Sequence, residues 1–185
     1  WADWLGEVLA AHDRLAARAD RVVLVGQSMG GSLVLRAAQL RPATLAGLVC
    51  INPLVRSRGD EVIEMLDDYI DDGIRVAPGE GSDIADPDSS DISYPGTPLA
   101  PLRSLLVDGV TDLAGAVADL TAPLRLLTSR QDHVVDPADS EYLATAYGGP
   151  VQHTWLERSY HVATRDFDRD LVIAETVEFA GRVLR

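Results

Sequence analysis

Apolar residues along this chain follow two patterns, short continuous runs and longer stretches with helical spacing. Continuous runs occupy residues 22–25 and 45–51 and are typical of parallel strands buried on both faces. A strand is also predicted over 124–128. A further strand is predicted over 151–156. Helical spacing extends over 1–19, 30–41 and 168–184, and the last of these carries a stripe of Ile173, Val177, Ala180 and Leu184. Alternating strands and helices predict an α/β fold, a mostly parallel sheet with helices on both faces.

The middle of the chain departs from that alternation. Short helices are predicted over 61–70 and 102–110, whereas 78–101 is rich in Pro, Gly, Ser and Asp and predicts an irregular, acidic, mobile loop. Because this stretch separates two predicted strands of the sheet, we expect residues 54–122 to form a cap or lid. The core would then consist of residues 1–53 and 123–185.

Composition narrows the range of partners. The formal net charge is −13, and every basic residue is an arginine. An acidic surface repels phosphate backbones, so nucleic acid and anionic membranes are poor partners and a neutral or cationic small molecule is favoured. A single cysteine, Cys50, excludes an internal disulfide. No apolar run approaches the roughly 20 residues that span a bilayer, and we expect a cytoplasmic protein.

A serine lies in a glycine-rich turn between the first predicted strand and the helix that follows it. The sequence Gly-Gln-Ser-Met-Gly-Gly at 26–31 fits the G-x-S-x-G pattern, which places Ser28 on a sharp bend at the carboxyl edge of the sheet. The glycines on either side, Gly26 and Gly30, are expected to let strand and helix approach without a clash of β-carbons. The helix amino terminus favours negative charge that develops during acyl transfer. The alternatives are a turn with no catalytic role and a loop that binds phosphate.

A serine nucleophile needs a base, and the base needs an orienting carboxylate. The chain supplies them in the order serine, acid, histidine: Asp132 follows the strand 124–128, and His161 follows the strand 151–156. Asp136 is a rival acid, but its place before Pro137 is typical of a helix cap.

Three other histidines compete with His161 for the role of base. His12 lies on the apolar stripe of the first helix and is expected at the edge of a core. His153 lies inside a strand and is expected to pack, and His133 is expected at the surface or in a pocket. His161 alone comes just past a strand end, so we identify it as the base.

These pieces together resemble the α/β-hydrolases, in particular their bacterial carboxylesterase and monoacylglycerol lipase branch. The resemblance rests on the turn at 26–31, on Ser-Arg-Gln-Asp-His-Val-Val at 129–135 and on Ser-Tyr-His-Val at 159–162. It implies that Ser28 is the nucleophile, Asp132 the acid and His161 the base. It also implies that the amide of Met29 is one donor of an oxyanion hole.

The resemblance further implies that the first strands of the α/β-hydrolase fold are missing. The loop after those strands would supply the second oxyanion donor, so we expect it to precede residue 1. On this hypothesis residues 1–185 alone fold and act poorly.

The function implied is a serine hydrolase that cleaves carboxylic esters of short- to medium-chain acids, or monoacylglycerols, without a metal or an organic cofactor. Lid residues Ile63, Leu66, Leu105 and Leu106 either line an acyl pocket or pack on the core. A thioesterase, an acyltransferase or a C–C bond hydrolase uses the same triad, and a non-catalytic ligand-binding homologue is the alternative of another class.

Overall fold

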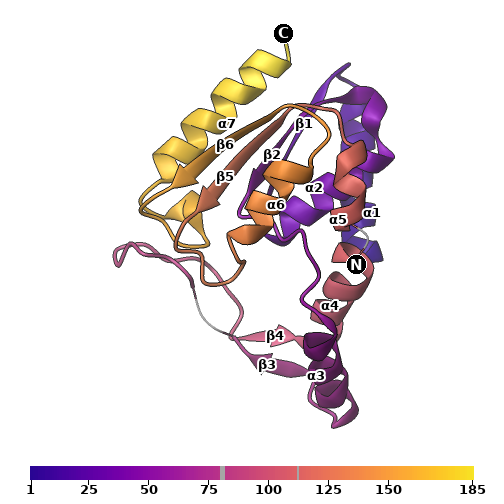
Figure 1. Ribbon diagram of the computed structural model, residues 1–185, viewed down its shortest axis with the longest axis vertical. Helices are drawn as coiled ribbons and strands as arrows, with labels where there is room; N and C mark the ends of the chain where they lie inside the picture. Colours follow the sequence, from indigo (N-terminus) through magenta and orange to yellow (C-terminus); the bar gives the residue numbers. More distant parts are fainter. Residues whose placement is uncertain (80–81, 112) are drawn as a thin grey trace.

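The computed structural model describes residues 1–79, 82–111 and 113–185. Its main sheet is parallel throughout and has the order β1-β2-β5-β6 (Figure 1). The strands are β1 (Val22–Gln27), β2 (Leu45–Ile51), β5 (Leu124–Ser129) and β6 (Val151–Leu156). The predicted α/β architecture is therefore confirmed, and each predicted strand of the sheet is present.

Helices cover both faces of this sheet (Figure 1). On one face, α2 (Met29–Leu40), α5 (Leu113–Ala116), η3 (Val117–Asp119) and α6 (Ala138–Ala146) contribute to one apolar cluster with β2 and β5. On the other face lie η4 (Ala163–Arg165) and α7 (Arg169–Val183). At the amino end, α1 (Ala2–Ala16) contacts α2, and η1 (Pro42–Thr44) leads into β2. None of the helices described is long and apolar enough to cross a membrane.

The two central strands are buried on both faces, which explains the continuous apolar run of β2 and the mostly apolar sequence of β5. Leu48 and Cys50 of β2 point into the cluster beside α2 and α6, whereas Val49 and Ile51 point toward α7. Strand β1 lies at the edge of the sheet. Its outer side pairs with no strand among the described residues, and Val25 is 49% exposed there.

The burial of Cys50 gives a direct test of this core. Its side chain is fully buried, and burial raises the pKa of the thiol to about 12. We expect a dithionitrobenzoate assay to detect no reactive thiol in the native protein and one thiol per chain after denaturation in guanidinium. Rapid reaction under native conditions would contradict the central position of β2.

The stripe predicted for the last helix is wrong. Ile173, Val177 and Leu184 are exposed, and α7 instead buries Val172 and Phe179. Glu175 lies between these two in sequence and forms an ion pair with the buried Arg125 of β5, with 2.6 Å between Oε2 and Nη2. A charged residue therefore occupies the inward face, so the apolar pattern pointed to the opposite side of the helix.

Between β2 and β5 the chain forms a second structural layer below the sheet (Figure 1). Helix α3 (Asp60–Asp71) agrees with the prediction, and β3 (Val76–Pro78) pairs antiparallel with β4 (Gly96–Pro98). The prediction of a loop over 78–101 is thus wrong at both ends. Pro78 belongs to β3, residues 96–98 form β4, and α4 (Leu99–Ser104) begins at Leu99. The helix predicted over 102–110 is the end of α4 followed by a π-helical segment, η2 (Leu105–Val110).

This layer has an apolar cluster of its own. Leu66, Leu105 and Leu106 are buried in it, and Ile63 packs at its margin. The cluster also includes Val135 of the loop after β5, and the partly buried Met29 of the serine turn packs against it. The predicted lid residues therefore form an apolar layer that reaches the carboxyl edge of the sheet. Residues 80, 81 and 112 of the proposed lid lie outside the described part of the chain.

Candidate active site

Ser28 occupies a strained turn at the carboxyl end of β1. Its φ of 55° and ψ of −123° lie where residues other than glycine are uncommon, and such a conformation costs about 1–3 kcal/mol. The turn is held by the Ser28 N–H, which donates to Ile51 O at 3.0 Å, and by Ser28 O, which accepts from Gly31 N–H at 2.8 Å. The half-buried serine thus stands between the end of a strand and the start of α2, the context that the G-x-S-x-G pattern predicts.

The glycines around this turn differ in the space that a β-carbon would have. A β-carbon on Gly26 would lie 2.1 Å from Gly30 O, so the close approach expected at Gly26 is confirmed. A β-carbon on Gly30 would point into open space, so that expectation is wrong for Gly30. The second crowded position is Gly31, where a β-carbon would lie 2.5 Å from the Pro53 side chain.

Met29 is the first residue of α2, so its N–H has no acceptor within the helix. Together with the positive end of the helix dipole, this donor favours an anion beside Ser28. The role of an oxyanion donor, expected for Met29 from the sequence, stays a prediction.

Asp132 and His161 meet at the same edge of the sheet. His161 Nδ1 lies 2.8 Å from Asp132 Oδ2, and the two side chains are 9% and 1% exposed. The other carboxylate oxygen, Oδ1, accepts the N–H groups of Val134 and Val135 at 2.9 and 2.8 Å. The buried carboxylate is therefore satisfied by hydrogen bonds on both oxygens, which holds it against the imidazole.

The serine turn and the histidine loop adjoin each other. Gln27, the residue before Ser28, donates from Nε2 to His161 O at 3.4 Å and accepts from the Thr164 hydroxyl at 2.9 Å. In the described part of the chain, no hydrogen bond joins the Ser28 hydroxyl to His161. Catalytic hydrogen bonds of this kind often tighten only when substrate is bound.

The rival residues have other roles. Asp136 Oδ1 accepts the Ala138 N–H at 2.9 Å at the start of α6, as a capping residue does. His12 is buried in α1 and lies 3.0 Å from the Thr44 hydroxyl. His153 packs on Trp155, and burial lowers its pKa.

His133 is a surface residue whose side chain is 59% exposed, and its Nδ1 lies 2.8 Å from Asp83 Oδ1. Of the four histidines, only His161 contacts a buried carboxylate at the carboxyl edge of the sheet.

Asn52, the only asparagine in the chain, was missed by sequence analysis. Its φ is 46° and it is 1% exposed, directly after β2. The side chain Nδ2 donates to His161 O at 2.8 Å and to Ser129 Oγ at 3.0 Å, and Oδ1 accepts Ser129 N–H at 2.7 Å. Ser129 Oγ in turn donates to Tyr160 O at 2.8 Å. This network clamps the carbonyls of the histidine loop.

Replacement of Asn52 by leucine removes these hydrogen bonds and places at positive φ a larger apolar side chain, which tolerates that conformation less well than asparagine does. We expect the free energy of unfolding to fall by about 2–4 kcal/mol, since buried partners lose their hydrogen bonds. Urea denaturation measures the change. The matched control is Gln131→Leu, an exposed amide, which should alter stability by less than about 0.5 kcal/mol. Equal stability of the two variants would contradict the clamp.

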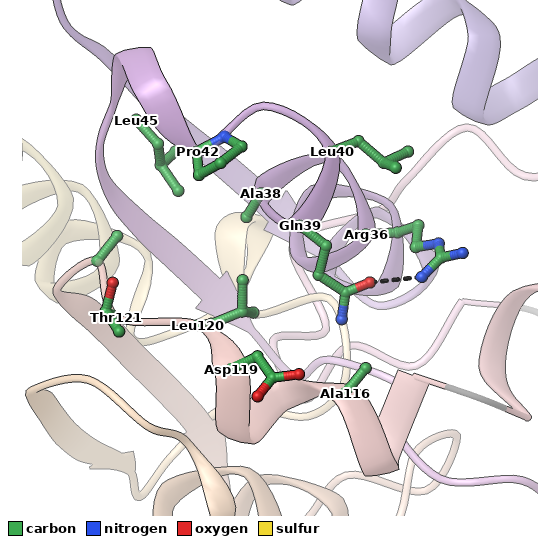
Figure 2. Close-up of a pocket in the computed structure, with 11 residues that line it drawn as sticks. Arg36, Ala38, Gln39, Leu40, Pro42, Leu45, Ala116, Asp119, Leu120 and Thr121 are labelled. Carbon is green, nitrogen blue, oxygen red and sulfur yellow. Dashed lines mark hydrogen bonds between the residues drawn. The ribbon is translucent and has the colours of Figure 1, made fainter.

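A separate pocket lies at the opposite end of the sheet (Figure 2). It has a volume of about 520 Å³ and is bounded by the end of α2, the start of β2 and the segment 116–122. Arg36 donates to Gln39 Oε1 at 2.6 Å on its wall. Because Leu45 begins β2 here whereas Ser28 lies at the other end of the strands, this pocket is remote from the Asp132–His161 pair.

The chain is similar to known hydrolases. The family model described as serine aminopeptidase, S33, matches residues 2–70. The chain is 28% identical to the thermostable monoacylglycerol lipase of Bacillus sp. (strain H-257), over 97% of this chain and 70% of that protein. It is 24% identical to a carboxylesterase of Bacillus subtilis (strain 168), over 98% of this chain and 72% of that protein.

Solved structures extend the comparison. A chain from the work on LipS and LipT, two metagenome-derived lipolytic enzymes, superimposes with a TM-score of 0.89 at 32% identity, covering 98% of this chain and 73% of that one. The monoacylglycerol lipase of Paleococcus ferrophilus shares the fold, with a TM-score of 0.72 at 17% identity over 96% of this chain and 75% of that one. The protein belongs to the α/β-hydrolases, in their bacterial carboxylesterase and monoacylglycerol lipase-like branch. It is an esterase- or lipase-type hydrolase.

Proposed function

We propose that this hydrolase cleaves carboxylic esters through a triad of Ser28, His161 and Asp132. The observation that carries the proposal is the hydrogen bond between His161 Nδ1 and the buried Asp132, at the sheet edge where Ser28 is held in a strained turn. Asp132 keeps the imidazole in the tautomer that presents Nε2 as an acceptor.

The mechanism has two acyl-transfer steps. His161 takes the hydroxyl proton as Ser28 Oγ attacks the ester carbonyl carbon, and the Met29 N–H stabilises the developing oxyanion. The imidazolium then gives its proton to the alkoxy leaving group, which departs as an alcohol and leaves an acyl-serine. In the second step His161 activates a water molecule, which releases the carboxylic acid and restores Ser28.

The proposed substrates are esters of short- to medium-chain acids, including monoacylglycerols. Residues 54–122 would be the lid over the site, with 1–53 and 123–185 as the core. The apolar lid cluster supports this, because Leu105 and Leu106 lie in the same cluster as Met29 and Val135, next to the nucleophile turn and the acid loop. The two Bacillus relatives, a monoacylglycerol lipase and a carboxylesterase, support the same class of substrate.

A panel of p-nitrophenyl esters from acetyl to palmitoyl, together with a monoacylglycerol, tests the substrate class. We expect hydrolysis of the esters up to medium chain length and of the monoacylglycerol, with weaker activity on long chains. An acyl-coenzyme A and an aminoacyl p-nitroanilide distinguish a thioesterase and an aminopeptidase. Failure to cleave any ester, with turnover of either of the other two substrates, would overturn the proposal.

A further inference from the structure

The segment of residues 82–95, which leads into β4, approaches the carboxyl edge of the main sheet (Figure 1). Residues 83–89 of this segment, called the strap below, lie against the histidine loop, residues 159–168. The strap belongs to the proposed lid, whereas the histidine loop belongs to the core. Contacts between the two are polar and specific.

Asp83 makes the most direct of these contacts. Its Oδ2 accepts the backbone N–H of His161 at 3.0 Å and that of His133 at 3.1 Å, and its Oδ1 lies 2.8 Å from His133 Nδ1. The backbone carbonyl of Asp83 also accepts the Val162 N–H at 3.1 Å. The side chain is only 16% exposed. One carboxylate of the strap therefore bridges the loop that follows the acid and the loop that carries the histidine.

Asp166 of the histidine loop makes the reciprocal contact. It is 2% exposed, and its carboxylate accepts the N–H groups of Ala85 and Asp86 in the strap at 2.7 and 3.0 Å. The same carboxylate accepts the N–H of Tyr160, the residue before His161, at 2.8 Å. The strap and the histidine loop therefore each supply a carboxylate that accepts backbone N–H groups of the other segment.

These contacts hold the peptide groups that flank the His161 side chain. Asn52 binds the His161 carbonyl, and Asp83 binds the His161 N–H. On the side-chain end, Asp132 binds Nδ1. A shift of about 1 Å in a catalytic group can cost on the order of 10²-fold in rate. The hydrogen bonds to the backbone of His161 therefore affect the rate by fixing the position of Nε2.

We propose that Asp83 is a positioning residue that sets the orientation of His161 from the strap of the lid. This inference rests on the proposed function of His161 as the base of the triad. Asp83 touches the backbone of His161, not its reacting nitrogen, so it acts through His161.

Electrostatics keep this carboxylate charged. Burial acts to raise the pKa of Asp83, but hydrogen bonds from the His133 side chain and from the N–H groups of His161 and His133 outweigh it, and the pKa is lowered. A carboxyl with a lowered pKa stabilises the fold above the pKa of the unfolded aspartate, and this contribution is lost as the pH falls through the folded value. The Asp83 carboxylate is therefore charged at neutral pH and accepts all of these hydrogen bonds.

Two substitutions of Asp83 separate positioning from general destabilisation. Asp83→Ala removes both carboxylate oxygens, and we expect kcat to fall by about 10- to 100-fold with little change in KM. Asp83→Asn keeps one oxygen that accepts the His161 N–H, and it should restore most of kcat. Asp88→Ala, an exposed aspartate of the same strap, is the matched control and should leave kcat unchanged.

The rate at which a fluorophosphonate labels Ser28 supplies the second measurement, and it also counts the active sites. We expect slower labelling of Asp83→Ala than of the wild type. A wild-type rate of labelling and a wild-type kcat per labelled site in Asp83→Ala would overturn the inference. If the wild-type enzyme is active but Ser28 is not labelled at all, the proposed triad fails first, so the two failures are distinguishable.

Discussion

Replacement of Ser28 by alanine is expected to lower kcat for ester hydrolysis by about 10⁴- to 10⁶-fold, as removal of a triad serine does. In the proposed mechanism the variant loses the oxygen that forms the acyl-enzyme, whereas the Met29 amide and the apolar cluster of the proposed lid stay. Stopped assays with a p-nitrophenyl ester, together with substrate binding, measure the loss.

A nearby serine provides the control for this substitution. Ser32 lies one helical turn further along α2, is fully buried, and donates its hydroxyl to Leu54 O at 2.5 Å. Ser32→Ala should cost about 1 kcal/mol of stability through the lost hydrogen bond but keep kcat within a few fold. Equal residual activity in Ser28→Ala and Ser32→Ala would contradict the assignment of the nucleophile.

The second large effect is expected at Asp132. In Asp132→Asn the amide oxygen can still accept from Val134 and Val135, but the amide NH₂ then faces His161 Nδ1. This forces the proton onto Nε2, the nitrogen that accepts the serine proton in the proposed mechanism. We expect kcat to fall by about 10³- to 10⁴-fold, because the histidine is held in the wrong tautomer.

Asp136→Asn distinguishes the two candidate acids. An asparagine at this position still accepts the Ala138 N–H at the start of α6, so both stability and kcat should remain near the wild-type values. Kinetics of the two variants side by side decide between the acids. A large loss in Asp136→Asn with a small loss in Asp132→Asn would reverse the assignment.

The strands were predictable because each carries its own local signal. Strand β2 is a continuous apolar run, as burial on both faces demands, and β5 is apolar apart from Arg125 and its last two residues, Thr128 and Ser129. The face of α7 was not predictable, since Glu175 is turned inward by an ion pair with Arg125 of another element. The π-helical segment 105–110 also has no distinct apolar period, so its sequence predicts an ordinary helix.

The proposed triad was predictable from chain order, because the ends of parallel strands meet at one edge of the sheet. The residues that hold the histidine loop were not. Asp83 lies 78 residues from His161 along the chain, and Asn52 lies 109 residues from it. Neither residue belongs to a motif, and a loop aspartate or asparagine alone is typical of a turn. Only the three-dimensional structure brings them to the backbone of the base.

Covalent labelling tests the central claim, that Ser28 is the nucleophile, most directly. The enzyme is treated with a fluorophosphonate and cleaved after arginine, and the peptide from Val22 to Arg36, which holds Ser28 and Ser32, is fragmented by mass spectrometry. We predict one adduct per chain, located on Ser28 and formed much more slowly in His161→Ala. An adduct on Ser32 or on a serine elsewhere, or full esterase activity in enzyme that carries the Ser28 adduct, would contradict the account.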